Sequence, residues 1–258
     1  MFVAIACGAL SFMTQAHAAI KTQAVEYSAG GTTMQGFVAY DDAKKGPRPG
    51  ILIVHDWMGL GPFAKDKARQ LAGEGYVAFA ADIYGKGVRP KSPAEAGKLA
   101  GKFKSDRPLL RERVRAAFDK LVAMKQTDAK KVVAMGYCFG GTTALELARS
   151  GAPLAGTASF HGGLSTPTPE DAKNIHGPVL AMHGADDPNV PPSEVEAFKE
   201  EMKKAGVKMK FVAYPGAVHA FTNPAAGNDN SKGAAYNAEA DKKSWVEFEQ
   251  FLKEAVGG

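Results

Sequence analysis

The chain has 258 residues, of which 45% are hydrophobic and 23% charged, and this composition excludes a disordered protein. Its formal net charge of +5 comes from lysines and arginines scattered along the chain rather than from a basic block. This distribution argues against nucleic acid as a partner, and the length suits one α/β domain with a single large core.

The N-terminal segment has the pattern of a signal peptide. An apolar run from Phe2 to Met13 is followed by Ala16-His17-Ala18, although no lysine or arginine precedes the run. Because the run is shorter than the roughly 20 residues that span a bilayer, we expect a signal peptide at residues 1–18 and a single domain at residues 19–258. This predicts a periplasmic or secreted protein that does not bind the membrane after cleavage, with a cytoplasmic protein as the alternative.

The rest of the chain alternates between strand-like and helix-like segments. Residues 24–28 and 34–40 flank two glycines and predict an opening hairpin. Six apolar runs then have the pattern of buried parallel strands, at residues 50–56, 76–84, 131–136, 156–162, 178–184 and 208–214. Four stretches with a one-sided apolar stripe predict helices around residues 64–72, 110–121, 195–202 and 245–252. The sequence therefore predicts an α/β fold, a mostly parallel central sheet with helices on both faces.

Functional side chains in such a sheet follow the carboxyl ends of the strands. At one predicted strand end, residues 136–140 read Gly-Tyr-Cys-Phe-Gly and precede a helix-like segment. This is the spacing of a nucleophile elbow with cysteine in place of serine, and a helix N-terminus favours the thiolate of Cys138. A small buried side chain is the alternative for an isolated cysteine, and signal cleavage would remove Cys7, the only other one.

A candidate acid and a candidate base follow Cys138 in the chain. Asp187 and His219 stand in the order that an α/β-hydrolase fold requires, nucleophile then acid then histidine. His219 would take the thiol proton, and Asp187 would hold the imidazole and stabilise its cation. Asp186 competes as the acid, and we prefer Asp187. The other histidines fit local hydrogen bonding, and none has the spacing of metal ligands, so we expect no metal.

Two backbone N–H groups would complete the site. Phe139 directly follows the nucleophile, and Trp57 lies in the loop after an earlier strand, so these two are the predicted oxyanion-hole donors. Asp56, next to Trp57, fits either a loop hydrogen-bond acceptor or a carboxylate that opposes thiolate formation.

The motifs "GYCFGG", "HDWMGL", "AADIYG", "HGADDP" and "YPGAVHAF" occur in the chain in this order. With them, the chain resembles the dienelactone hydrolase family of α/β-hydrolases from about residue 24 to the C-terminus. The resemblance implies hydrolysis of enol-lactones and related esters without a metal or organic cofactor. It also implies Cys138 as nucleophile, His219 as base and Asp187 as orienting acid, and it places Asp56 where family members have glutamate.

The substrate-binding positions depart from the family. Its members that act on dienelactone hold the substrate carboxylate with two arginines, and those positions correspond here to Lys86 and Asn223. Arg89 stands near the first position, and a lysine binds a carboxylate without the bidentate fork of arginine. Tyr84 and Phe221 complete the substrate-binding candidates, for a compact cyclic or aromatic ester.

Our leading hypothesis is a cysteine-dependent hydrolase of small esters or lactones that uses a Cys-His-Asp triad. The alternative is a non-catalytic binding protein that retains the fold, because fold alone does not establish function. A peroxide-sensitive thiol ranks below both, since the mature chain offers no second cysteine to resolve it. We expect a monomer or small homo-oligomer whose partner is a small-molecule substrate.

Overall fold

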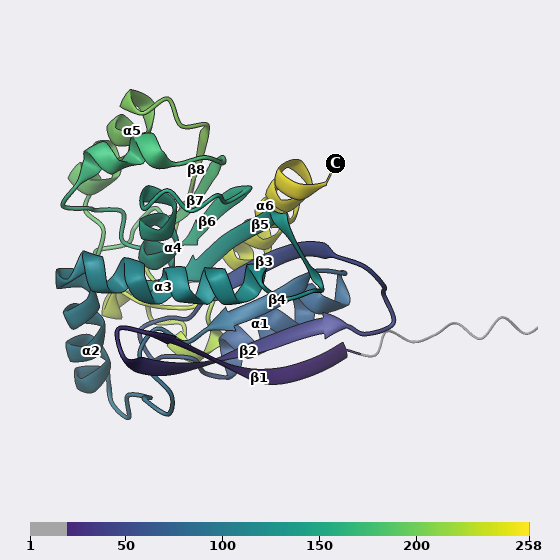
Figure 1. Cartoon of the computed structure of the whole chain (residues 1–258). Coiled ribbons are helices and arrows are strands. Elements are labelled where there is room, and N and C mark those ends of the chain that lie inside the picture. Colours follow the sequence, from purple (N-terminus) through teal and green to yellow (C-terminus); the bar gives the residue numbers. More distant parts are fainter. Residues whose placement is uncertain (1–19, 258) are drawn as a thin grey trace, which may run out of the picture.

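A twisted sheet of eight strands forms the centre of the computed structural model, which describes residues 20–257 (Figure 1). The strand order is β1-β2-β4-β3-β5-β6-β7-β8. The strands are β1 (Ile20–Ala29), β2 (Thr32–Asp41), β3 (Arg48–Val54), β4 (Val77–Ala81), β5 (Thr127–Tyr137), β6 (Gly156–Phe160), β7 (Val179–Gly184) and β8 (Met209–Tyr214). The predicted signal peptide, including Cys7, lies outside the described residues.

The sheet combines an antiparallel edge with a parallel centre. β1 and β2 form the predicted hairpin, whose turn places Gly30 and Gly31 at φ +52° and +71°, in the left-handed region that glycine favours. β2 also pairs antiparallel with β4, while every other neighbouring pair in the described sheet is parallel. The prediction of a mostly parallel sheet is therefore confirmed.

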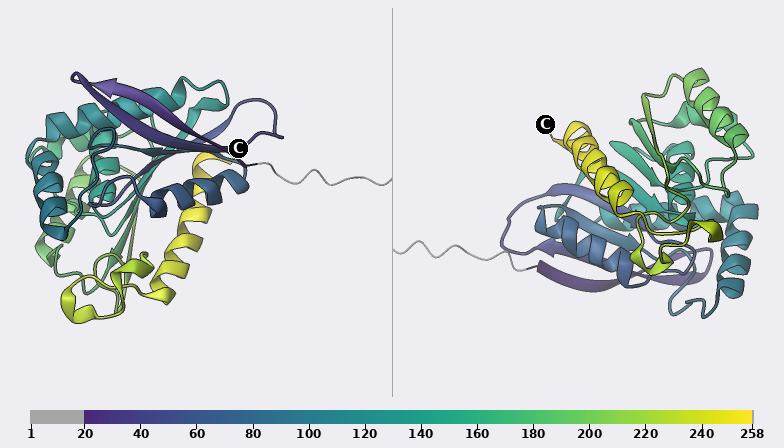
Figure 2. Two further views of the ribbon diagram at one scale, coloured as in Figure 1. Left: turned by 90° about the horizontal axis from the view of Figure 1, so that it is seen from below. Right: turned by 180° about the vertical axis from the view of Figure 1, so that it is seen from behind.

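Helices cover both faces of the sheet (Figure 2). On one face α3 (Arg107–Val122) and α4 (Phe139–Arg149) pack on Leu52 and Val54 of β3, and on the other face α1 (Pro62–Gly73) and α6 (Ala238–Val256) share a core with Ile51 and Ile53. Successive side chains of a strand point to opposite faces, so this continuous apolar run fills both cores. α5 (Pro192–Lys204) forms a smaller cluster beside β7.

Two connections differ from the simple alternation in the sequence pattern. Between β6 and β7 the chain forms a 3-10 turn, η1 (Pro169–Asn174), in place of an α-helix. Between β4 and α3 it forms α2 (Pro93–Ser105), a helix that was not among the predicted ones; its buried stripe is short, Ala96, Ala100 and Phe103. A local signal was present: the Ser92 hydroxyl accepts the Glu95 N–H, and the Glu95 carboxylate accepts the Lys91 N–H, close to a capping box. No helix in residues 20–257 is long and apolar enough to cross a membrane.

Candidate active site

Cys138 stands in a tight turn between β5 and α4. It has φ 55° and ψ −116°, a strained conformation for a residue other than glycine. Its N–H donates to the carbonyl of Phe160 at the end of β6 (3.0 Å). The turn thus fixes the thiol at the carboxyl ends of the parallel strands, as the elbow motif predicts.

The two glycines of the motif stand where backbones meet. A Cβ on Gly136 would lie 2.1 Å from the carbonyl oxygen of Gly140, and a Cβ on Gly140 would lie 2.2 Å from that of Val54 in β3. No side chain fits at either position, so the spacing in the sequence reflects the close packing of β5, α4 and β3.

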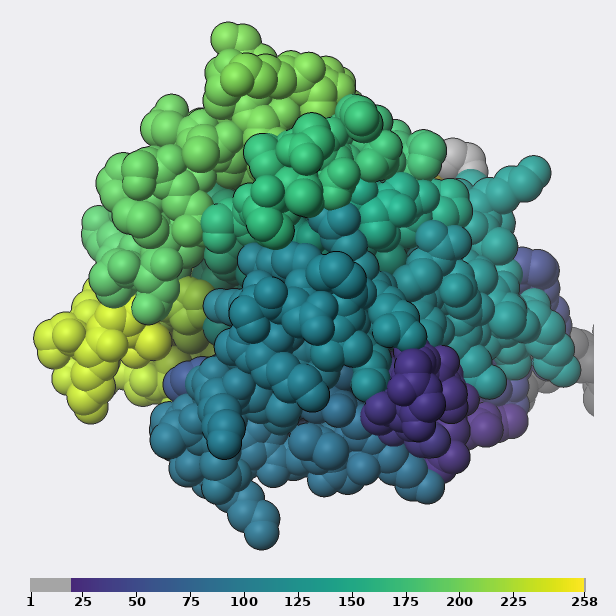
Figure 3. Space-filling model, turned by 60° about the vertical axis from the view of Figure 1, so that its left-hand side comes forward, coloured from purple at the N-terminus to yellow at the C-terminus, as the bar shows by residue number. Residues whose placement is uncertain are grey.

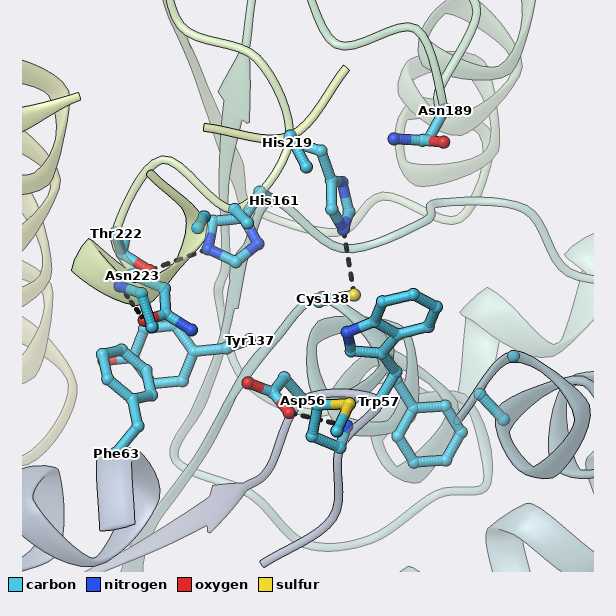
Figure 4. Close-up of a pocket in the computed structure, with 18 of the residues that line it drawn as sticks. Asp56, Trp57, Phe63, Tyr137, Cys138, His161, Asn189, His219, Thr222 and Asn223 are labelled. Carbon is cyan, nitrogen blue, oxygen red and sulfur yellow. Dashed lines mark hydrogen bonds between the residues drawn. The ribbon is translucent and has the colours of Figure 1, made fainter. Parts of the chain in front are cut away.

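Cys138, His219 and Asp187 form a continuous chain of contacts, of which Figure 4 shows the one between His219 and Cys138. The Nε2 atom of His219 lies 2.9 Å from the sulfur, and its Nδ1 atom lies 2.8 Å from Oδ2 of Asp187. The other oxygen of Asp187 accepts the Asn189 N–H (2.8 Å). Asp186 is exposed and instead accepts the Gly216 N–H, so of the two aspartates Asp187 is the one that orients His219.

The contacts among Cys138, His219 and Asp187 favour the ionised forms of His219 and Asp187. Burial alone would lower the pKa of His219, but the adjacent Cys138 and the hydrogen bond to Asp187 outweigh it and raise that pKa to about 10. Burial likewise opposes ionisation of Asp187, yet the contact with His219 holds its pKa below the ordinary value. The contacts with Cys138 and Asp187 therefore favour the protonated form of His219, which donates its Nδ1–H to the carboxylate.

The backbones of Phe139 and Trp57 belong to separate elements that line the same cavity as the thiol. Phe139 begins α4, and the first N–H groups of a helix have no partner within it. In the turn after β3, the N–H groups of Met58 and Gly59 both bond to Asp56, and these two bonds leave that of Trp57 unused. Both predicted oxyanion-hole donors thus lie next to the cavity.

His55 and Tyr84 fix the loop that carries Trp57. The Nδ1–H of His55 donates to the carbonyl of Asp56 (2.6 Å), and its Nε2 accepts the Ile83 N–H (3.2 Å). Burial lowers the pKa of His55 to about 4, so the ring stays neutral and keeps both bonds. The Tyr84 hydroxyl donates to the carbonyl of Trp57 (3.0 Å), which makes Tyr84 a support of the loop.

Asp56 lines the cavity near His219. Its carboxylate accepts the Met58 N–H (2.8 Å), which fits the loop-acceptor role. Burial raises the pKa of Asp56, while the Met58 N–H and the positive His219 oppose the rise. Its charge therefore also acts on His219 across the cavity.

The triad opens into a cavity of about 630 Å³. One wall is the face of α2 that carries Gly97, Gly101 and Lys104, and the opposite wall is the segment 220–234 after His219. Trp57, which is 39% exposed, stands with Met58 at the cavity. Figure 3 shows α2 on the molecular surface, beside the yellow segment that follows β8.

The structure places one substrate-binding candidate, Asn223, in the cavity wall and the other four outside it. Asn223 caps the short turn η2 (Pro224–Ala226) by accepting the Ala225 N–H. Tyr84 and Phe221 are buried in the core and are not part of the cavity lining. Their placement gives no support for direct contact with substrate.

Lys86 and Arg89 are engaged elsewhere. Lys86 forms an exposed ion pair with Glu26 of β1 (2.5 Å). Arg89 donates to the Leu60 carbonyl (2.9 Å) and lies 3.3 Å from the buried carboxylate of Asp82. Neither residue is part of the cavity lining, so their placement gives no support for direct contact with substrate.

The sequence did not single out several residues of the cavity wall. They include Lys104, His161, Asn189, Thr222 and Lys232. His161 directly follows β6. This position at a strand end indicates a residue of the site, but the sequence pattern was interpreted as local hydrogen bonding only. Within residues 20–257, no group of three or more His, Cys, Asp or Glu side chains could hold a metal ion.

Comparison with known proteins agrees with this architecture. The chain is 33% identical over 205 residues to Protein usf of Aquifex pyrophilus, and this match covers 78% of this chain and 87% of that protein. A dienelactone hydrolase-like promiscuous phosphotriesterase from metagenomic libraries is 38% identical, with a TM-score of 0.87 over 92% of this chain and 99% of that one. The dienelactone hydrolase of Anabaena variabilis, 22% identical, shares the fold with a TM-score of 0.61 over 81% of this chain and 92% of that one.

The family model described as "Dienelactone hydrolase family" matches residues 34–256. This range includes β3 to α6 and every residue of the site described above. The protein is therefore a hydrolase with the α/β-hydrolase fold, and the chain belongs to the dienelactone hydrolase family.

Proposed function

We propose that this protein is a cysteine-dependent hydrolase of small, uncharged esters or lactones. The observation that carries the proposal is the contact chain from Cys138 through His219 to Asp187, at the mouth of a cavity large enough for a small molecule.

The first half of the reaction forms an acyl-thiol. The sulfur of Cys138 attacks the carbonyl carbon, and a C–S bond forms while the carbonyl oxygen becomes an oxyanion. The N–H groups of Trp57 and Phe139 bind this oxyanion. As the intermediate collapses, the C–O bond breaks and the leaving oxygen takes the Nε2 proton of His219. The raised pKa of His219 suits this step, because it favours the form that carries the Nε2 proton.

The second half returns the free enzyme. His219, now neutral, takes a proton from water, and the resulting hydroxide attacks the acyl-thiol. The C–S bond breaks, the acid product leaves, and the sulfur regains its contact with the His219 cation. Asp187 stabilises this cation throughout and holds the ring in one orientation.

The cavity supports an uncharged, compact substrate. Among residues 20–257 the lining holds no arginine; its cationic side chains are Lys104 and Lys232, and Lys232 lies 3.7 Å from Asp229. Trp57, Met58 and Phe63 add apolar surface to the lining. A cyclic or aromatic ester fits these walls better than a carboxylate-bearing lactone.

The test combines turnover with intact-mass spectrometry on p-nitrophenyl esters, neutral lactones and dienelactone. A phosphotriester joins the panel because one similar structure is a promiscuous phosphotriesterase. We expect turnover and a transient acyl adduct with the wild type, and neither with Cys138→Ala. Turnover that survives in Cys138→Ala would overturn the proposal, whereas binding without turnover in the wild type would favour the binding-protein alternative.

The N-terminal pattern leads us to propose export as well. The apolar run and the Ala16-His17-Ala18 site favour cleavage after residue 18. N-terminal sequencing of the protein from fractionated cells would test this, and an intact N-terminus in the cytoplasmic fraction would contradict it.

A further inference from the structure

His161 is a buried histidine beside the triad with one ring nitrogen unused. It directly follows β6, is 2% exposed and forms part of the cavity wall. Its Nε2 atom lies 2.8 Å from the hydroxyl of Thr222, while its Nδ1 atom has no hydrogen-bond partner in residues 20–257. Buried polar atoms are nearly always paired, so an unpaired one in a cavity wall calls for a functional explanation.

The backbone of His161 is strained as well. Its φ of 42° is uncommon for a residue other than glycine. Its N–H donates to Met182 of β7 (2.8 Å), and the carbonyl of the preceding Phe160 accepts the N–H of Cys138. Both sides of the strained residue are therefore tied to the framework of the site, and such strain concentrates at functional sites.

The ring of His161 packs edge-to-face against His219, with centroids 5.3 Å apart and planes at 64°. Phe221 packs against it in the same manner, at 5.0 Å. Figure 4 shows one nitrogen of His161 bonded to Thr222 and the opposite edge of the ring turned toward His219 and Cys138. The unpaired Nδ1 atom therefore faces the candidate base.

The proton on His161 has a preferred position. Burial, and next the charge of His219, hold the pKa of His161 well below its ordinary value, so the ring is neutral. If Nε2 carries the proton, it donates to Thr222 and leaves the Nδ1 lone pair beside the His219 cation. The other tautomer would place an unpaired buried N–H beside that cation, which is unfavourable for both.

We propose that His161 is a positioning residue that stabilises the protonated form of His219, and that Thr222 holds its ring in the tautomer that does so. The proposal rests on the proposed function in one respect, the role of His219 as acid and base. The ionisable groups around His219 come from the ends of three strands, β3, β5 and β7: Asp187 and Cys138 in direct contact, and Asp56 and His183 at longer range. Of the neutral rings, His161 is the one that contacts it.

The test follows the titration of His219 by NMR in protein without substrate. In His161→Phe, which keeps the ring and removes the lone pair, we expect the titration to move to lower pH by about one unit. Thr222→Val should move it in the same direction, because it frees the tautomer. Adding Thr222→Val to His161→Phe should then have little further effect on the His219 titration, since both changes remove the same interaction between His161 and His219. The alkaline limb of the kcat/KM profile should move with the titration.

His183→Phe is the matched control. His183 lies near the end of β7 and also has an unpaired Nδ1 atom, but it packs on Phe211 and does not line the cavity. We expect it to leave the His219 titration close to that of the wild type.

An unchanged His219 titration in folded His161→Phe, or in Thr222→Val if His161→Phe does not fold, would overturn the proposal. An equal displacement in His183→Phe would overturn it too, because it would show a general effect of removing a buried imidazole. The NMR titrations need no turnover, so they separate this proposal from the hydrolase proposal, which fails only if Cys138 carries no chemistry.

Discussion

Replacing Gly140 by alanine tests whether the packing of α4 on β3 holds the nucleophile in place. The new Cβ would lie 2.2 Å from the carbonyl oxygen of Val54 and 2.6 Å from that of His55, whereas ordinary contact begins at 3.4 Å. Relief of the first contact requires a displacement of 1.2 Å, the difference between 3.4 and 2.2 Å. Overpacking costs about 1 to 3 kcal/mol, and rigid backbone neighbours place this variant at the upper end.

The same displacement would move Cys138 relative to His219. A misplacement of about 1 Å at a reacting group lowers the rate about 100-fold, so we expect kcat/KM to fall by about this factor. Urea unfolding and ester hydrolysis measure the two effects. Gly73→Ala is the control: it lies at the exposed end of α1 with nothing within 4 Å of its new Cβ, so alanine should stabilise the helix by about 0.5 kcal/mol. If Gly140→Ala matched the wild type in both assays, the close-packing argument would be refuted.

Three further results are expected. Asp187→Asn should lower kcat/KM by about 100-fold or more, whereas Asp186→Asn, the same change one residue earlier, should have little effect; equal losses would contradict the assignment of the acid. His219 holds the pKa of Asp187 below its ordinary value. Ionised Asp187 therefore stabilises the fold at pH values above the ordinary pKa, and this stabilisation is lost as the pH falls through the lowered pKa. Asp187→Asn should therefore weaken the acid-side decline of the melting temperature, and an identical decline in both proteins would refute the coupling. Arg149→Met should destabilise the protein by about 3 to 5 kcal/mol in urea, because it leaves the buried carboxylate of Glu201 without its partner and that of Glu146 with Arg111 alone. Lys199→Met, at an exposed ion pair, should cost less than about 1 kcal/mol, and similar losses would contradict this.

The fold and the order of the site residues were predictable because they depend on local patterns. Apolar runs mark buried strands wherever they pack, and the glycines around Cys138 report a close contact that any elbow of this type needs. Strand ends then locate the loops that carry Asp187 and His219. None of these inferences requires knowledge of which distant residues meet.

The walls of the cavity were less predictable because they depend on tertiary contacts. Lys86 stands in the expected loop, but its partner is Glu26, 60 residues away on the edge hairpin. His161 gains its surroundings from Thr222, 61 residues later in the chain. The direction in which a loop side chain points is set by such partners, and spacing along the sequence does not contain it.

The two walls of the cavity differ in how freely they can change. The segment 220–234 continues directly from His219, and backbone bonds at Gly233 and Ala235 hold His219 in place. A substitution there alters the shape of the cavity and the alignment of the base together. The α2 wall contributes small side chains and one lysine, and it takes no part in the hydrogen bonds that join Cys138, His219 and Asp187. New substrate preferences should thus arise most readily by changes in α2, which makes this helix the natural starting point for laboratory evolution.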